Sequence, residues 1–593
     1  MNLLITLGHN SSAILVDNDG NVINGIEEER LSRKKSDSSF PRRAIEHVIT
    51  KEDKTKYLLD NIYISHWFDN FDFFVDYWAD KKSEKIAKYL NFEYLDDLIN
   101  ENPGCKLNML DDQFTHHDAH AYSAMAFYEN FEITSQFEMV DKPDYHIIVA
   151  DGFGNQQEVF TIYHVSFDED GNKDIQLLQK SYGYQNSLGL LYQYATAFTG
   201  MKENKDEWKY LAYESHIKEV ISYKEIKAIS EYAQSYAAVL VNNLLKYTNK
   251  SRVNISNELI NLEDLAKCKT QIFNDLTIVL KLLEKKPIDQ FTEYEKRVII
   301  GFFVQSVIEK VLAEYIRIYD IQNLLVAGGL FYNVKLNNKC TSELPGKFCA
   351  IPAAGDQGAA IGAYYRDFGV FKYGNGCWGK RTLEVPLQKL PERTLFFSNK
   401  ENLAKMAVQL LKDNKLVQIV VGNAEFGPRA LCHTSTLFIP SKDNAAINDT
   451  QNDRLSLMPL GPVLLQRNMD FFFDEKDFSK VVGSDRYMIV TYDYKDNKLI
   501  LNYQGVMHKY PQEEKFSGRP QIIRDEKSTI FSILDGVDKE LGIKALVNTS
   551  FNVHSEPIVY SVDDAINNFR FQQEHCQKEH LDKTYLLIGT YEE

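Results

Sequence analysis

The sequence predicts an α/β protein of two or more domains, and three observations lead to this prediction. Short apolar runs end at Asp or Gly, as at residues 147–152 and 324–329, which is typical of buried strands that lead into a site. Residues 229–247 and 294–319 instead repeat apolar residues at helical spacing. A chain of 593 residues also exceeds the size that a single hydrophobic core usually supports.

The composition is that of an ordinary globular protein, with 44% apolar and 25% charged residues. A net charge of -17 argues against broad binding of nucleic-acid backbones. No apolar run is long enough to span a bilayer, and the start reads as a strand rather than a signal peptide. The seven cysteines form no CxxC pair. We therefore expect a cytoplasmic protein without disulfides, zinc fingers or membrane segments.

The first 110 residues predict three strands followed by mixed structure. Residues 2–7, 12–16 and 22–27 read as strands, and DNDGN at 17–21 forms the turn between the last two. The polar loop 8–12 is either a plain connection or a place where backbone N–H groups face an anion. The charge run at 27–35 is expected to be solvated surface. Pro41 opens a helix, and residues 50–110 predict helix and loop.

The stretch THHDAH at 115–120 is the centre of the predicted site. His116 and His120 are four residues apart, so a helix places both imidazoles on one face, as a single metal ion requires. Asp151, which ends an apolar strand, and Asp356, in a Gly-rich turn, offer oxygen ligands. We predict that these four side chains meet around one metal. The alternative is a half-buried helix whose histidines are satisfied by protein groups.

Two later segments offer places for a nucleotide or another anion. A strand, the pair Gly328–Gly329 and a helix beginning near Asn333 form a possible nucleotide cradle, although a Gly pair by itself is more often structural. After a Gly- and Pro-rich boundary at 366–400, Arg429 follows a Gly-Pro turn, where its planar fork can bind phosphate or carboxylate.

These stretches, taken in order, resemble the nodulation/cephamycin-type O-carbamoyltransferases, a family that includes the tobramycin carbamoyltransferase. The similarity covers nearly the whole chain. The matching motifs are GHNSSA at 8–13 with EEER at 27–30 and FPRRAI at 40–45, HHDAHA at 116–121, DGFG at 151–154, GG at 328–329 with Asn333, GDQGA at 355–359, EFGPRAL at 425–431, and NTSFN at 548–552 with EP at 556–557.

The resemblance implies an actin-like ATPase-fold (ASKHA) domain, like that of the tRNA threonylcarbamoyl-transferase, followed by a YrdC-like α/β domain. We place the first at residues 1–370, a linker at 371–400 and the second at 401–593. In such enzymes the second domain makes carbamoyl-adenylate from carbamoyl phosphate and ATP with magnesium. The first domain, which holds iron or zinc, transfers the carbamoyl group to a hydroxyl. A homodimer is compatible with the resemblance.

The resemblance also assigns roles to individual residues. The metal ligands would be His116, His120, Asp151 and Asp356. The residues for catalysis would be His9, His117 and Lys209. The residues that bind nucleotide or carbamoyl phosphate would be Gly328, Gly329, Asn333, Arg429, Arg454, Arg519, Asn548, Ser550 and Asn552.

Some positions depart from the family pattern. Asn452, Leu455 and Met458 stand where the family usually has Lys, Glu and Arg, and His554-Ser555 replaces an Arg-Gly pair. The sequence therefore leaves three hypotheses. The leading one is an ATP-dependent O-carbamoyltransferase whose acceptor is a small molecule, a sugar or, with least support, a hydroxymethylated base. The others are a tRNA threonylcarbamoyl-type transferase and a non-catalytic module that binds nucleotide and metal.

Overall fold

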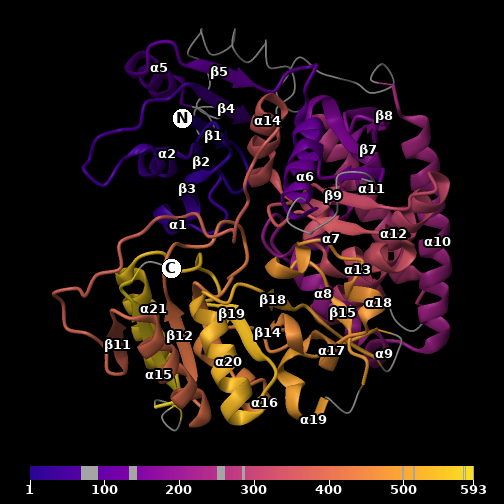
Figure 1. Ribbon diagram of the computed structural model, residues 1–593. Coiled ribbons are helices and arrows are strands. Elements are labelled where there is room, and N and C mark those ends of the chain that lie inside the picture. The colour runs from indigo at the N-terminus through magenta and orange to yellow at the C-terminus, as the bar shows by residue number, and fades with distance from the viewer. Residues whose placement is uncertain are drawn as a thin grey trace.

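The computed structural model describes residues 1–67, 91–132, 143–249, 261–283, 287–496, 500–511, 515–577, 580 and 582–591. These residues form an N-terminal region with two sheets and a C-terminal region below it, as Figure 1 shows. Among them, no helix is both long and apolar enough to cross a membrane.

The two sheets of the N-terminal region repeat one topology. In each, the first strand pairs antiparallel with the second and parallel with the fourth, the second pairs antiparallel with the third, and the fourth pairs parallel with the fifth. This duplication is what an actin-like ATPase fold requires. The strands are β1 (Asn2–Thr6), β2 (Ser12–Val16), β3 (Val22–Glu27), β4 (Asn61–Ser65), β5 (Lys106–Met109), β6 (Tyr145–Ala150), β7 (Glu158–Phe167), β8 (Lys173–Tyr182), β9 (Leu324–Ala327) and β10 (Phe348–Ala350).

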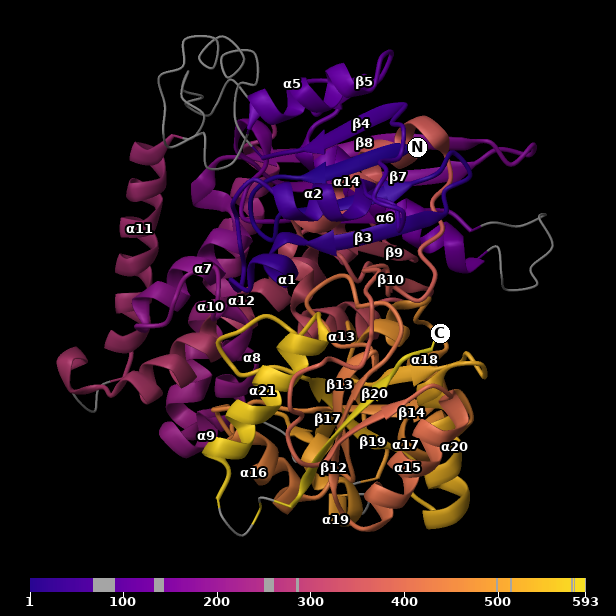
Figure 2. The same cartoon turned by 90° about the vertical axis from the view of Figure 1, so that its left-hand side faces the viewer.

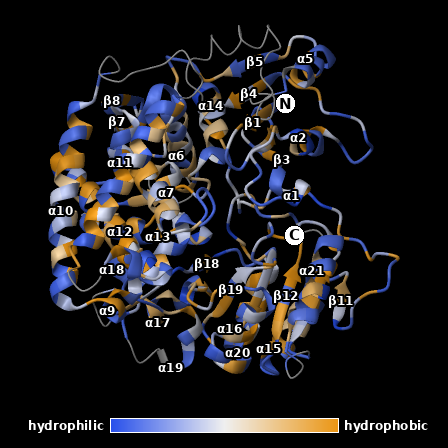
Figure 3. Ribbon diagram, turned by 180° about the vertical axis from the view of Figure 1, so that it is seen from behind, coloured by the Kyte–Doolittle hydropathy of each residue, from blue (hydrophilic) through white to orange (hydrophobic). Residues whose placement is uncertain are grey.

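Helices surround both sheets. Figure 3 shows apolar residues concentrated on α12 and on part of α10, which pack together beside the second sheet. The helices of this region are α1 (Glu28–Ser32), α2 (Arg42–Ile49), α5 (Phe92–Glu101), α6 (His116–Glu132), α7 (Leu188–Phe198), α8 (Tyr210–Tyr213), α9 (Ile217–Val220), α10 (Tyr223–Lys246), α11 (Leu262–Lys281), α12 (Glu293–Ile318), α13 (Val334–Glu343) and α14 (Ala359–Phe368).

The C-terminal region is built on a mixed sheet in the order β11-β20-β12-β13-β19-β14-β18. Its strands are β11 (Thr394–Phe397), β12 (Leu416–Val420), β13 (Thr434–Phe438), β14 (Gly461–Leu465), β18 (Gln521–Ile523), β19 (Leu546–Ser550) and β20 (Thr584–Gly589). A small sheet joins β15 (Tyr492–Asp493), β17 (Phe516–Gly518) and β16 (His508–Lys509). The helices are α15 (Lys400–Lys412), α16 (Lys442–Gln451), α17 (Met469–Phe472), α18 (Glu475–Phe478), α19 (Ile500–Tyr503), α20 (Thr529–Leu541) and α21 (Val562–His575).

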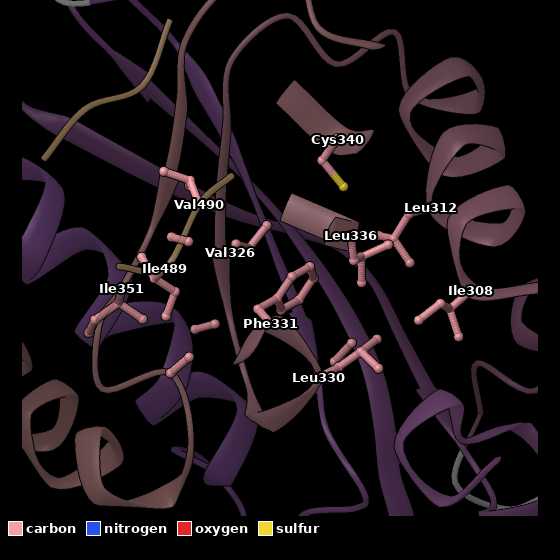
Figure 4. Packing of buried hydrophobic residues seen from close by; sticks show 14 of the residues in the cluster. Ile308, Leu312, Val326, Leu330, Phe331, Leu336, Cys340, Ile351, Ile489 and Val490 are labelled. Atoms are coloured by element: carbon pink, nitrogen blue, oxygen red, sulfur yellow. The ribbon is translucent and has the colours of Figure 1, made fainter. Parts of the chain in front are cut away.

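The two regions share a hydrophobic core. Ile489 and Val490, from the C-terminal region, are fully buried and pack with Val326 on β9 and Ile351 after β10, as Figure 4 shows. Asn337 on α13 adds a polar link, since its side-chain amide donates to the Ile489 carbonyl at 2.7 Å. This packing holds the loops of the C-terminal region against the edge of the second sheet.

The predicted α/β fold class is confirmed, and the predicted strands at 2–7, 12–16, 22–27 and 147–151 occur within a residue or two of the expected bounds. The expectation of only helix and loop at 50–110 was wrong. Residues 61–65 and 106–109 form β4 and β5, which extend the first sheet. These strands are short, so their local pattern is weak, and pairing decides their conformation: β4 pairs with β1, and β5 pairs with β4. Part of the segment, 68–90, lies outside the described residues.

Candidate active site

Four predicted metal ligands meet at one point. The Nε2 atoms of His116 and His120 lie 3.1 Å apart. Asp151 Oδ2 lies 3.6 Å from the first and 3.3 Å from the second of these atoms. The corresponding distances from Asp356 Oδ1 are 3.5 and 3.9 Å. One ligand atom from each of the four residues lies within 4.8 Å of all the others. We call this group the His-Asp cluster.

The topology explains why distant residues converge here. β6, β9 and β10 are parallel neighbours, so the residues that follow them share one edge of the sheet. Asp151 follows β6, and Asp356 lies in the turn after β10. The histidines come from the first two turns of α6. Gly362 on α14 lets the helices touch, because a Cβ there would lie 1.8 Å from the carbonyl oxygen of Ala119 on α6.

The cluster fits a metal ion. Zn–N bonds of about 2.1 Å place two ligands of a tetrahedral ion about 3.4 Å apart, close to the observed spacings. His116 Nδ1 lies 3.2 Å from the His66 carbonyl, which fixes the tautomer and leaves Nε2 with a lone pair toward the centre. Asp151 Oδ2 is buried with no hydrogen-bond partner in the described chain. Burial lowers the pKa of His116, but the two carboxylates outweigh burial and raise it to about 10, so the cluster attracts positive charge.

A buried network holds the start of α6. Lys180 Nζ lies 2.9 Å from Asp118 Oδ1 and 3.0 Å from Glu158 Oε1. Glu158 Oε2 accepts the backbone N–H of His117 at 3.2 Å, and Asn155 Oδ1 accepts that of His116 at 2.8 Å. These bonds satisfy helix N–H groups that have no partner within α6. They also tie the histidines to the chain that follows Asp151.

Three arginines of the C-terminal region gather where it faces the N-terminal region. The pKa of Arg519 is held well below its usual value by burial and by the positive charges of Arg429 and Arg454, so the three lie within electrostatic range. Arg454 pairs with Asp449 at 3.0 Å. Arg429 and Arg519 have no hydrogen bond or ion pair with any described residue, and the buried Nε of Arg429 is unpartnered. This arginine cluster suits an anion.

A clamp from the N-terminal region holds the loop that carries Arg429. The Glu27 carboxylate accepts the N–H of Gly427, and Arg30 Nη2 donates to the Gly427 carbonyl at 2.7 Å. Arg33 donates to the carbonyls of Pro557 and Ile558 at 2.9 and 2.8 Å. Figures 1 and 2 both place α1 where the regions meet. Glu27 and Arg30 are 3% and 2% exposed, so the expectation that residues 27–35 are solvated surface was wrong for this part of the run.

Burial raises the pKa of Glu27 from 4.5 to about 7. The folded state therefore holds this proton more tightly than the unfolded chain, and the stabilisation that protonated Glu27 provides is lost as pH rises from about 4.5 to 7. We expect the melting temperature of Glu27→Gln to fall less between pH 5 and 8 than that of the wild type, by at least about 2 °C. Thermal unfolding at both pH values measures this, with the exposed Glu93→Gln as control. Equal slopes for wild type and Glu27→Gln would contradict the prediction.

Comparison with known proteins now identifies the family. Residues 3–365 match the carbamoyltransferase N-terminus family, and residues 408–584 match the carbamoyltransferase C-terminus family. The chain belongs to the carbamoyltransferase family. It is therefore an enzyme that transfers carbamoyl groups.

Individual relatives are distant. An uncharacterized protein of Methanocaldococcus jannaschii, MJ1051, is 25% identical over 98% of both chains. The nodulation protein NolNO of Sinorhizobium fredii is 24% identical over 99% of this chain and 79% of its own length. Among solved structures, HypF of T. kodakarensis is similar to 63% of this chain and 48% of its own, with 14% identity and a TM-score of 0.28.

Three of the predicted nucleotide-binding residues of this carbamoyltransferase lie between β9 and α13. Gly328 and Gly329 follow β9, and a Cβ on Gly328 would lie 2.2 Å from the Ala150 carbonyl oxygen. A Cβ on Gly329 would lie 3.0 Å from Asp151 Oδ1. Asn333 caps α13 and its amide donates to Gln305 at 2.7 Å, so its side chain already has structural partners.

The predicted ligand residues of the NTSFN motif, at 548–552, lie near the loop that carries Arg429. The Asn548 amide donates to the Ala430 carbonyl at 2.8 Å and to Gln521 Oε1 at 2.6 Å. The Asn552 amide donates to the Val553 and Glu556 carbonyls at 2.9 and 2.8 Å. Ser550, at the end of β19, is half-buried. The two asparagines therefore hold these loops through their side-chain amides.

The three predicted catalytic residues make no direct contact with the His-Asp cluster through any hydrogen bond or ion pair among the described residues. His9 is exposed in the turn between β1 and β2. His117 is fully buried, with Nδ1 2.8 Å from Thr161 Oγ1, and burial holds its pKa well below the usual value. Lys209 pairs with Asp206 at 2.8 Å.

The sequence analysis missed the Glu27–Arg30 clamp. One signal was available, because the charge run begins inside the predicted strand 22–27, and a strand residue belongs to the sheet. The partner of the clamp, Gly427, is 400 residues away and gives no local signal.

Proposed function

We propose that this carbamoyltransferase is an ATP-dependent O-carbamoyltransferase. Water cleaves carbamoyl phosphate into carbamate and phosphate, and the carbamate oxygen then attacks the α-phosphorus of ATP, which forms carbamoyl-adenylate and releases pyrophosphate. The carbamoyl group then passes to a hydroxyl of an acceptor, and AMP leaves. The observation that carries the proposal is the arginine cluster, because two of its guanidinium groups have no hydrogen bond or ion pair within the described part of the chain and all of the substrates of the first step are anions.

In this proposal the arginine cluster binds the anionic substrates, and the His-Asp cluster binds the metal. The arginines bind phosphate oxygens through paired hydrogen bonds, and the clamp on Gly427 holds Arg429 in position. His116, His120, Asp151 and Asp356 would hold the metal. A bound divalent metal supplies a Lewis acid, which stabilises negative charge on the departing phosphate. Gly328 and Gly329, which let the chain after β9 approach Ala150 and Asp151 closely, would bring the nucleotide next to the metal ligands.

The departures from the family pattern leave this arrangement in place. Asn452, which stands where the family usually has Lys, is 4% exposed, and its side chain bonds to Asn448 and Gln572. Met458 is 2% exposed. Both side chains therefore belong to the interior of the C-terminal region. Arg429, Arg454 and Arg519 remain as cationic groups, which favours a working first step over a non-catalytic module.

The test is pyrophosphate release from ATP and magnesium, measured with and without carbamoyl phosphate and with no acceptor. We expect carbamoyl phosphate to raise pyrophosphate release at least about 100-fold, since the first step needs both substrates. A parallel reaction with inorganic phosphate in place of carbamoyl phosphate is the control. If a folded, metal-loaded preparation releases no pyrophosphate in response to carbamoyl phosphate, the proposal is wrong.

A further inference from the structure

Tyr332 lies beside the His-Asp cluster. It ends the short helical turn Gly329–Tyr332, directly after the Gly pair. A Cβ on Gly355 would lie 3.0 Å from a ring carbon of Tyr332 and 3.6 Å from its hydroxyl, so the phenol packs against the residue before Asp356. The side-chain amide of Gln357 donates to the Tyr332 hydroxyl. The phenol therefore contacts the same turn that presents a metal ligand.

The same phenol faces the C-terminal region. Burial raises the pKa of Tyr332 most strongly and a backbone hydrogen bond from Gly355 lowers it, while the charges of Glu27 and Asp356 raise it and that of Arg429 lowers it. Tyr332 and Arg429 each influence the pKa of the other, so the phenol and the guanidinium lie within electrostatic range. The Tyr332 side chain thus lies within electrostatic range of Arg429 in the proposed anion site and of Asp356 in the His-Asp cluster.

The residues on both sides of Tyr332 are held in place by packing and by a helix cap. Leu330 and Phe331, the two preceding residues, are 7% and 0% exposed and point into the core in Figure 4. Asn333, the next residue, caps α13. Tyr332 itself is half-buried and is thus less enclosed than Leu330 and Phe331. Because Gln357 donates to the phenol oxygen, the phenol proton is available to another acceptor.

We propose that Tyr332 is a substrate-contacting residue that joins the two sites, and that its hydroxyl donates a hydrogen bond to a phosphate or carbonyl oxygen of the acyl-adenylate lying between Arg429 and the His-Asp cluster. This inference rests on the proposed function for the identity of the ligand. The position of Tyr332 between the sites can be tested without activity.

The first test uses 3-fluorotyrosine incorporated throughout the protein and observed by fluorine NMR. The resonance that is missing in Tyr332→Phe is that of Tyr332. We expect it to shift when inorganic phosphate is added and to shift or broaden when Co²⁺ is added. The resonance of Tyr315 is the internal control, since that buried tyrosine also accepts a hydrogen bond from a glutamine, at 2.9 Å from Gln179 Nε2. A Tyr332 signal that responds to neither addition, or to only one, would overturn the inference.

The second test separates the two half-reactions. In Tyr332→Phe we expect carbamoyl-phosphate-dependent pyrophosphate release in the first turnover within about twofold of wild type. Steady-state AMP release, with water as the acceptor, falls at least about tenfold, as for loss of one hydrogen bond to a charged group. Tyr315→Phe is the matched control and keeps both rates. A wild type without pyrophosphate release refutes the proposed function, whereas normal AMP release by Tyr332→Phe refutes the role of Tyr332.

Discussion

Replacing Asp356 by Asn is expected to remove the metal and stop carbamoyl transfer while the protein stays folded. Asp356 Oδ1 lies 3.5 and 3.9 Å from the two imidazole Nε2 atoms, and a neutral amide is a poorer ligand than a carboxylate. Loss of residues that merely support ligands already weakens metal binding about 10- to 100-fold, so loss of a ligand should cost at least about 100-fold. Metal content after dialysis, measured by mass spectrometry, and AMP release give the two readouts.

The matched control is Asp367→Asn in the helix that follows the same turn. Asp367 accepts a hydrogen bond from Tyr63 at 2.8 Å and is not part of the His-Asp cluster. We expect this variant to keep its metal and its activity. Unchanged metal content in Asp356→Asn would show that the four side chains do not form a metal site, and the histidines would then be satisfied protein groups.

Replacing Arg519 by Met is expected to weaken anion binding strongly and, at the same time, to stabilise the protein. Arg519 is a cation with no described partner, close to Arg429 and Arg454, so its charge is costly when no anion is present. In the wild type, inorganic phosphate should raise the melting temperature by binding only the folded state. In Arg519→Met, the protein without phosphate melts higher, phosphate binds about 100-fold more weakly, and pyrophosphate release falls by a similar factor.

Arg467→Met provides the control, because Arg467 is exposed and pairs with Asp535 at 2.8 Å. That variant should lose little stability and keep its response to phosphate. Calorimetric titration with phosphate and thermal unfolding with and without phosphate measure both effects. A lower melting temperature for Arg519→Met together with an unchanged phosphate response would contradict the arginine cluster as an anion site.

Much of the site was predictable because its signals are local. The spacing of His116 and His120 follows from the period of a helix, which their positions on α6 confirm. Asp151 and Asp356 stand at strand ends, and the parallel order of β6, β9 and β10 brings such ends to one edge. Arg429 was recognised from its Gly-Pro turn, where Gly427 has a φ of +100° that favours glycine.

Other features depend on partners far away in the sequence. The charge run at 27–35 looks like ordinary surface, and only contact with residues about 400 positions later buries Glu27 and Arg30. Asn333 stays a predicted nucleotide ligand, and only tertiary packing shows that its amide also donates to Gln305. Tyr332 carries no motif signal of its own, and its place becomes visible only when Gly355 and Gln357 are packed against it.

The sequence by itself therefore determined the α/β class, the carbamoyltransferase family and the four side chains of the His-Asp cluster, because helical spacing, strand ends and ordered motifs are written locally in the chain. Only the tertiary structure decided that the N-terminal region clamps the loop of Arg429 and that Arg429 and Arg519 have no partner among the residues that the structure describes. The physical reason is that burial and the pairing of charges depend on which distant segments pack together, and no local pattern encodes this.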